Sequence, residues 1–237
     1  MTPQPTDNYM VTIAERLKSA YARIALAAKN NQRDEHAISL LAVSKTKPVE
    51  DIVAAYQHGQ RQFGESYVQE AVTKVTELAH LTDIVWHFIG PIQSNKSAQV
   101  ATHFDWVQSV DRTKIAKRLN EQRPKDKTPL NVLIQVNISL EEAKSGCHPD
   151  ELMSLAEFIS GCDNLCLRGV MAIPAKTDDA QQQLQYFEQL SACFDKLKAQ
   201  YPQVDTLSMG MSNDVEAAIA AGSTMVRIGT DIFGQRN

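Results

Sequence analysis

A lysine at the end of an apolar run is the residue of this chain best suited to covalent chemistry. Lys45 follows the segment LLAVS at residues 40–44, and Pro48 ends the stretch. A short apolar run bounded by turn residues predicts a strand buried on both faces, and Pro48 suits the first turn of a following helix. Lys45 would then lie where a strand ends, and desolvation there would lower the pKa of its amine and leave a nucleophile. Such an amine can form a Schiff base with an aldehyde.

Two later segments contain the residue types of a phosphate-binding site. The stretch SMGMSND at 208–214 precedes the helical pattern VEAAIAAG, so its hydroxyl and amide groups could bind an anion or simply cap the helix. In RIGTDIFG at 227–234, Gly229 lets a ligand approach the backbone and Thr230 offers a hydroxyl. The two segments therefore favour a ligand that carries a phosphate.

The elements that must position these residues alternate along the chain. Helical patterns occur at 48–59 and 178–200, and a long extra helix is expected at about 7–30. Eight strand-like segments lie at 38–43, 61–64, 84–90, 104–110, 130–137, 165–172, 205–208 and 224–229. This α/β alternation predicts a single (β/α)8 TIM barrel in one domain spanning 1–237. An open doubly wound sheet is the alternative, but no dinucleotide-binding glycine motif follows the first strand.

A barrel of this kind places its chemistry where the strands end. Lys45, the loops after the seventh and eighth strands, and Arg227 would form one ring there, and those two loops are the usual phosphate site of the fold. Taken alone, Lys45 is more commonly a solvated lysine, and Arg227 an ordinary salt-bridge partner. The combination favours a phosphorylated aldehyde, and pyridoxal phosphate fits that description.

Other polar residues near the expected mouth have ordinary explanations as well. Glu65 and Tyr67, in the GESY stretch, could serve local packing. His87 is expected to be a hydrogen-bonded strand-end histidine rather than a general base. Lys144, in a loop after the fifth strand, could help a cofactor to enter or leave, with Lys47 as a second candidate; a solvated lysine is the alternative for each.

Bulk composition excludes several classes of protein. The net charge of −4 gives no basic excess, so no nucleic-acid or anionic-membrane partner is expected. No apolar run reaches the roughly 20 residues that span a bilayer, and the first ten residues lack the pattern of a secretory signal. No metal site is expected, because no histidines lie at zinc-finger spacing from the cysteines, and reduced thiols in a cytoplasmic protein are favoured. These cysteines are Cys147, Cys162, Cys166 and Cys193.

Several long, collinear stretches between about residues 8 and 234 resemble a known family. They are LLAVSKTKP, RQFGESYVQE, WHFIGPIQSNK, RGVMAIP, LSMGMSNDVEAAIAAGSTMVRIGT and IFG. They resemble the YggS/PROSC family of pyridoxal-phosphate homeostasis proteins. This resemblance implies a barrel like the N-terminal domain of alanine racemase, without the second, β-rich domain of that enzyme.

The motif match also implies roles for individual residues. Lys45 would carry pyridoxal 5′-phosphate as a Schiff base, and Arg227 would face the pyridine nitrogen. The groups around the phosphate would come from Ser208, Gly210, Ser212, Gly229 and Thr230. One position departs from the family pattern, because Ser66 stands where the family has asparagine, and this leaves any cofactor contact there open.

Three functions remain as hypotheses. The resemblance favours a non-enzymatic carrier that maintains intracellular pyridoxal phosphate, affects amino-acid and keto-acid balance and supplies apo-enzymes. A racemase or another pyridoxal-phosphate enzyme acting on amino acids is the second hypothesis. The opposite acid/base of a racemase normally comes from the missing domain, and the absence of that domain also favours a monomer. A sugar-phosphate aldolase is the third, and it would need further carboxylates or a second lysine inside the barrel. Asp205 is one of few candidates for that role.

Overall fold

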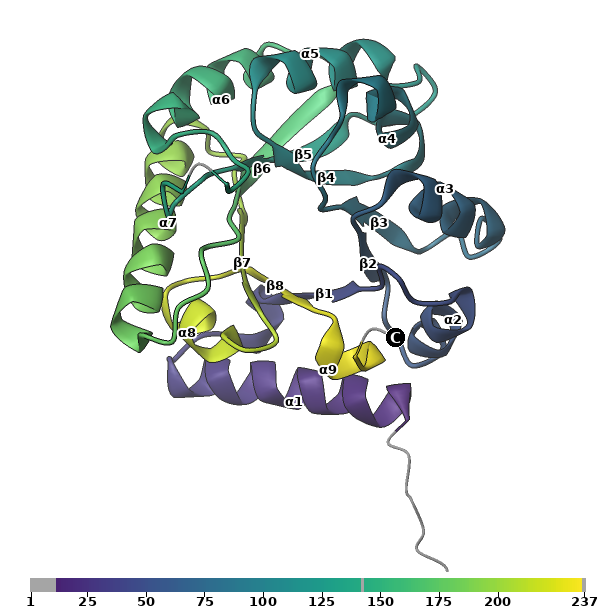
Figure 1. Cartoon of the computed structure of the whole chain (residues 1–237), viewed down its shortest axis with the longest axis vertical. Coiled ribbons are helices and arrows are strands. Elements are labelled where there is room, and N and C mark those ends of the chain that lie inside the picture. Colours follow the sequence, from purple (N-terminus) through teal and green to yellow (C-terminus); the bar gives the residue numbers. More distant parts are fainter. Residues whose placement is uncertain (1–11, 142, 236–237) are drawn as a thin grey trace, which may run out of the picture.

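Eight parallel strands close into a barrel in their order along the chain, with the helices outside (Figure 1). The computed structural model describes residues 12–141 and 143–235. The barrel closes where β8 pairs with β1, with Leu41 opposite Arg227. The strands are β1 Ser39–Val43, β2 Gln62–Glu65, β3 Val85–Phe88, β4 Trp106–Val110, β5 Leu130–Gln135, β6 Leu165–Met171, β7 Thr206–Met211 and β8 Met225–Ile228. The predicted (β/α)8 barrel is confirmed.

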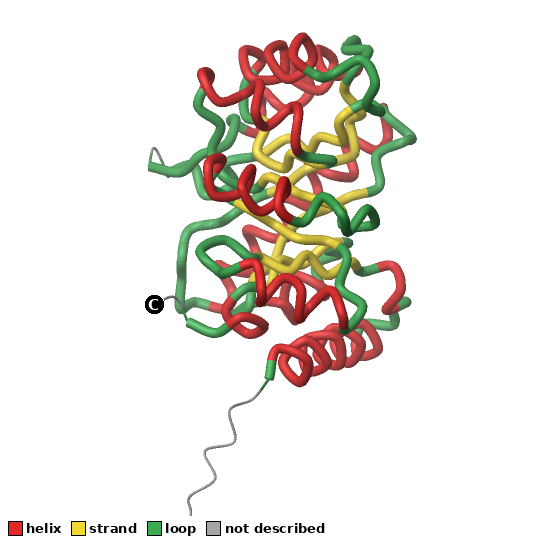
Figure 2. The backbone as a smooth tube through the Cα atoms, turned by 90° about the vertical axis from the view of Figure 1, so that its right-hand side faces the viewer, coloured by secondary structure: helices red, strands yellow, loops and turns green. Residues whose placement is uncertain are grey.

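Helices follow the strands and surround the barrel (Figure 2). They are α1 Ile13–Asn30, α2 Val49–Gln57, α3 Val68–Glu77, α4 Ser97–His103, α5 Thr113–Gln122, α6 Leu152–Ser160, α7 Ala180–Gln200, α8 Val215–Ala220 and α9 Thr230–Phe233, with 3₁₀ turns at Glu35–Ala37, Ser94–Lys96 and Pro149–Glu151. The extra N-terminal helix was expected from about residue 7, and that start lies outside the described residues. Within them, α1 begins after Thr12, whose hydroxyl accepts from the N–H of Glu15 while Glu15 accepts from the N–H of Thr12. This reciprocal cap explains the start at Ile13.

The barrel wall separates two apolar regions. The larger one lies between the wall and the helices; there the inward stripe of α7 is buried at Phe187 and Leu190. The smaller one lies inside the barrel and consists of Leu41, Ile89 and Met225, with Val43 packed against it. Alternate residues of a strand face opposite sides, so β1 and β8 supply both regions.

The seventh strand differs from its expected bounds. The sequence predicted a strand at 205–208, but β7 runs from Thr206 to Met211. Gly210 has a φ of +96°, and the register between β7 and β8 shifts between Ser208 and Met211. A glycine and an irregular register are typical of a β-bulge, which hides the last residues of a strand from a simple alternation pattern. Ser208 therefore lies within the strand, and Asp205 lies just before its amino end.

The described residues also bear on location and cysteine chemistry. Among residues 12–141 and 143–235, no helix is long and apolar enough to cross a membrane. The four cysteines are free thiols, and burial raises the pKa of Cys147 to about 12.

Candidate functional site

The turn that bears Lys45 lies at the carboxyl end of the barrel. Lys45 is half-buried and follows β1 by two residues, within a turn closed by a 3.0 Å hydrogen bond from the Lys47 N–H to the Ser44 carbonyl oxygen. Gly229, just after β8, lies against the same strand, because a Cβ atom there would be 3.1 Å from the carbonyl oxygen of Val43. The segment after β8 is thus adjacent to the strand that leads to Lys45.

Arg227 extends from β8 across the neighbouring strands. Its side chain donates from Nη1 to Ser208 Oγ over 2.7 Å and from Nη2 to the carbonyl oxygen of Ala172 over 2.7 Å. Arg227 is 3% exposed, and burial lowers its pKa to about 10, so it stays a cation at neutral pH. Both of these acceptors are neutral, and the site therefore holds a buried positive charge that suits an anionic or electron-rich ligand.

A chain of hydrogen bonds continues from Arg227 into the barrel. The Ser208 hydroxyl donates to Gln108 Oε1 over 2.7 Å, and Gln108 Nε2 lies 3.0 Å from His87 Nδ1. The His87 ring stacks on Trp106 with 5.2 Å between centroids, and burial lowers the pKa of His87 to about 3. His87 is thus neutral and hydrogen-bonded, as expected. Gln108 was not among the predicted site residues, and only its polar type within an apolar strand could have indicated it.

The polypeptide after β7 forms a tight turn before α8. Gly210, the last residue but one of β7, has a positive φ that favours glycine. A Cβ atom there would also lie 2.5 Å from the Cβ of Ala218. The N–H of Met211 donates to the carboxylate of Asp214, which closes the turn. Burial raises the pKa of Asp214 above its ordinary value, while Arg227 and Arg23 oppose this shift.

A helix far away in sequence holds together the two segments predicted to bind phosphate. Arg23 on α1 donates from Nη1 to the Ser212 carbonyl oxygen over 2.6 Å and to Asp231 Oδ2 over 3.0 Å. Its Nη2 also donates to Glu216 Oε2 over 2.6 Å. Figure 1 shows α1 lying along α8 and α9, the helices that follow these segments. Arg23 therefore links both segments and compensates two carboxylates near an expected anion site, a role that no local pattern around residue 23 reveals.

The predicted phosphate residues fall into two groups. Ser212 and Gly229 are half-buried and Thr230 is exposed, in the segments that follow the strands. Ser208 is fully buried, and its hydroxyl is engaged with Gln108 and Arg227. Ser208 therefore lies below the mouth, within the internal hydrogen-bond chain.

Glu65 and Tyr67, both in the GESY stretch, lie in different environments. Glu65 is fully buried, and Tyr67 is 51% exposed. Glu65 Oε1 accepts from the Ser44 hydroxyl over 2.6 Å and from Lys74 Nζ over 2.9 Å. Burial raises the pKa of Glu65, and the charge of Lys74 opposes that shift. The backbone of Ser66 packs closely on Gly90, where a Cβ atom would lie 2.1 Å from the Ser66 carbonyl oxygen.

The other lysines and the aldolase candidate have identifiable surroundings. Lys47 Nζ donates to the carbonyl oxygen of Gln235 over 2.7 Å. Lys144 is half-buried in a loop where its N–H donates to the carbonyl oxygen of Glu141 over 3.0 Å. Asp205, the candidate carboxylate for an aldolase, lies directly before β7. Asp205 pairs with Arg168 at the opposite end of the barrel from Lys45.

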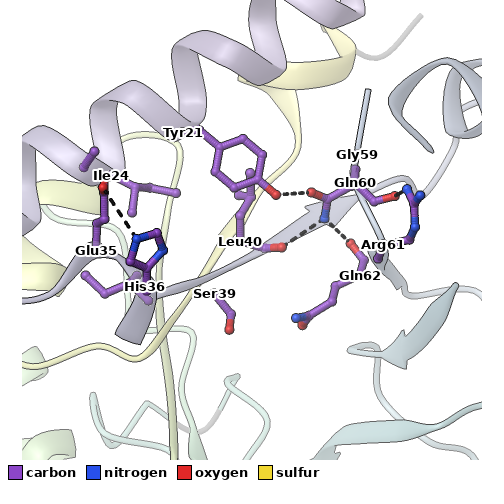
Figure 3. A pocket seen from close by; sticks show the side chains of 12 residues that line it. Tyr21, Ile24, Glu35, His36, Ser39, Leu40, Gly59, Gln60, Arg61 and Gln62 are labelled. Carbon is purple, nitrogen blue, oxygen red and sulfur yellow. Dashed lines mark hydrogen bonds and ion pairs between the residues drawn. The ribbon is translucent and has the colours of Figure 1, made fainter. Parts of the chain in front are cut away.

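Two cavities also lie at the amino ends of the strands. One of about 390 Å³ is bordered by α1, β1 and β2 (Figure 3). Tyr21 donates to Gln60 Oε1 over 2.7 Å, and Gln60 Nε2 donates to the carbonyl oxygens of Leu40 and Gln62 over 3.0 and 2.6 Å. The second cavity, of about 320 Å³, is bordered by Trp106 and the Arg168–Asp205 pair. In both cavities these polar groups bind one another, so the carboxyl end remains the candidate site.

Sequence comparisons relate the whole barrel to known proteins. Residues 22–237 match the family model of the alanine racemase N-terminal domain. The pyridoxal phosphate homeostasis protein of Pasteurella multocida is 56% identical over 230 residues, covering 96% of this chain and 99% of that protein. The protein of the same name from Escherichia coli K12 is 54% identical over 230 residues, covering 96% and 98%.

Solved structures show the same relationship. The structure of PipY from Synechococcus elongatus with PLP bound superposes with a TM-score of 0.80 at 35% identity, covering 94% of this chain and 100% of that one. Alanine racemase from Corynebacterium glutamicum superposes with a TM-score of 0.69 at 16% identity, covering 94% of this chain and 60% of that enzyme. The second likeness is one of fold alone.

Proposed function

Because the chain belongs to the family of pyridoxal phosphate homeostasis proteins, built on the alanine racemase N-terminal domain, we propose that it binds pyridoxal 5′-phosphate and maintains the supply of this cofactor. One observation carries the proposal: half-buried Lys45 and the buried cation of Arg227 both lie toward the carboxyl ends of two adjacent strands, β1 and β8. We further propose that the protein is a cytoplasmic monomer that carries this cofactor and supplies it to apo-enzymes.

The residues present fit this cofactor. Gly210 and Gly229 stand where a Cβ atom would meet Ala218 and Val43, so both predicted phosphate segments pack closely on neighbouring elements. Arg227 supplies a buried cation held by neutral acceptors. The donor set thus combines an amine, backbone N–H groups and a guanidinium, which match an aldehyde, a phosphate and a pyridine nitrogen.

Each of these residues has a distinct role in the proposal. Pyridoxal phosphate supplies an aldehyde, which condenses with a primary amine with loss of water, and an aromatic ring that withdraws electrons. Lys45 provides the amine as a Schiff-base lysine, and Arg227 faces the pyridine nitrogen. Ser208 holds Arg227 through its hydroxyl. The phosphate is bound by Gly210, Ser212, Gly229 and Thr230.

A trapping experiment tests this function. Purified protein loaded with pyridoxal phosphate and reduced with borohydride is expected to carry one pyridoxyl group on Lys45, identified by peptide mapping. Saturable binding with the adduct mainly on Lys47 or Lys144 would contradict the assignment of the lysine. Absence of saturable binding would contradict the function itself.

Little catalysis at the amino-acid α-carbon is expected from this site. Arg227 is a permanent cation and accepts no proton, so a pyridine nitrogen facing it stays unprotonated and withdraws electrons weakly. We expect L-alanine to undergo α-deuterium exchange and L-to-D conversion at rates well below about 1 s⁻¹, the low end of ordinary enzyme turnover. A rate of that size or more that is lost in Lys45→Ala would favour the racemase hypothesis over a non-catalytic carrier.

A further inference from the structure

The peptide groups on both sides of Lys45 are held by side chains of α3. The carbonyl oxygen of Ser44, just before it, accepts a 2.8 Å hydrogen bond from Lys74 Nζ. The N–H of Thr46, just after it, donates to Glu70 Oε1 over 2.6 Å. The peptide groups before and after Lys45 are therefore both fixed by hydrogen bonds to α3.

One buried ammonium connects these contacts. Lys74 is 4% exposed, and besides the Ser44 carbonyl it binds Glu65 Oε1 over 2.9 Å and Glu70 Oε1 over 2.6 Å. An ammonium has three N–H donors, and here three oxygens accept from them. The Ser44 hydroxyl adds a bond of 2.6 Å to the same Glu65 oxygen. We call Glu65, Glu70 and Lys74 the α3 clamp.

The α3 clamp reaches the turn from behind the barrel wall. Gly64 faces the interior, because a Cβ atom there would lie 3.1 Å from Leu41 Cδ2 and 3.4 Å from Ile89 Cδ1. The next residue, Glu65, therefore faces the helices on the other side, where α3 lies. The clamp thus acts on the backbone of the turn rather than on a ligand at the mouth.

The turn itself has a conformation that needs such support. Thr46 has a φ of +63°, in the left-handed region that a β-branched residue disfavours. The hydrogen bond to Glu70 fixes the N–H of this residue in that conformation. Without it, Thr46 would gain by returning to negative φ, and the direction of the Lys45 side chain would change with it.

We propose that the α3 clamp positions Lys45 for condensation with the cofactor aldehyde. This inference rests on the proposed function. In that step the neutral amine nitrogen forms a double bond to the aldehyde carbon, and the aldehyde oxygen leaves as water with the two hydrogens lost by the amine. The ring and phosphate are held by other segments, so the amine must be presented at a set place and angle. Glu70 and Lys74 are positioning residues, since they act through the backbone of the turn. Glu65 supports them by accepting from Lys74 and from the Ser44 hydroxyl.

Glu70→Ala is the first test, because this side chain is 30% exposed and its loss leaves the buried Glu65–Lys74 pair in place. In the ligand-free variant, the Thr46 amide is expected to exchange with deuterium at least about tenfold faster, since its acceptor is gone. Pyridoxal phosphate should form the lysine adduct with affinity lower by about tenfold or more. Pyridoxine 5′-phosphate, which has an alcohol in place of the aldehyde, should bind within about threefold of wild type. Glu77→Ala, at an exposed position at the end of α3, is the matched control.

A second variant separates positioning from a merely structural role. Thr46→Gly in the Glu70→Ala background should recover several-fold of the lost adduct affinity, because glycine adopts positive φ without steric cost. Equal weakening of both phosphate ligands, or unchanged adduct affinity despite faster Thr46 exchange, would overturn the positioning role. A wild-type protein that forms no adduct would instead overturn the proposed function, and the exchange rates would still report on the clamp.

Discussion

Lys45→Ala is expected to abolish the visible absorbance that wild-type protein gains on binding pyridoxal phosphate, and to leave borohydride with nothing to trap. The reason is chemical, because the proposed Schiff base needs a primary amine and Lys45 is the lysine proposed to supply it. The fold should be retained, since Lys45 lies after the strand and is only half-buried. Absorbance titration and the thermal midpoint of unfolding measure the two expectations.

Lys47→Ala and Lys144→Ala provide the controls for this change. Both lysines belong to loops at the same end of the barrel. The ammonium of Lys47 donates to the carbonyl oxygen of Gln235. Each variant is expected to keep the absorbance and the trapped adduct. A Lys45→Ala protein that still showed full absorbance would place the Schiff base on another lysine.

Removal of the phosphate from the ligand is expected to weaken binding at least tenfold. Charge-assisted hydrogen bonds contribute roughly 1.5–3 kcal/mol each. Because about 1.4 kcal/mol corresponds to a tenfold change in affinity, loss of even one such bond should weaken binding about tenfold or more. The predicted donors lie in two segments, around Gly210 and Ser212 and around Gly229 and Thr230. Equilibrium titration with pyridoxal phosphate and with pyridoxal gives the ratio of affinities directly.

Arg23 offers a way to test this preference from the protein side. Arg23→Gln would separate the two segments and leave Glu216 and Asp231 uncompensated near the phosphate. We expect it to reduce the ratio of the two affinities, chiefly by weakening the phosphorylated ligand. Arg61→Gln, which removes a surface pair with Asp83, is the control. Equal affinities of pyridoxal and pyridoxal phosphate for wild-type protein would contradict a phosphate site.

The barrel was predictable because its pattern is local and repeated. Each strand is a short apolar segment and each is followed by a helical one, so the alternation survives small errors at the ends. Lys45 was placed at the end of β1 because the apolar run stops and Pro48 follows it. Errors occurred where geometry is irregular, as at β7, where a bulge beside Gly210 carries the strand on to Met211.

The supporting residues of the site were less predictable, because their roles depend on partners far away in sequence. Arg23 contacts segments nearly two hundred positions later, and nothing in an amphipathic helix marks one arginine from the rest. Lys74 reaches the turn of Lys45 from a different element, and its burial contradicts the usual exposure of lysine. Gln108 binds Ser208 and His87, which belong to two other strands of the barrel.

The closure of β8 against β1 has a consequence for biosynthesis. Lys45 follows the first strand and Gly229 follows the last, so the proposed cofactor site straddles the seam where the barrel closes. A growing chain cannot assemble this seam until β8 has left the ribosome, and such distant pairing is slow to form. Binding competence should therefore appear only after β8 has emerged. If the protein binds the cofactor as proposed, free cofactor would favour the closed barrel by mass action. The cofactor pool would then stabilise newly made protein.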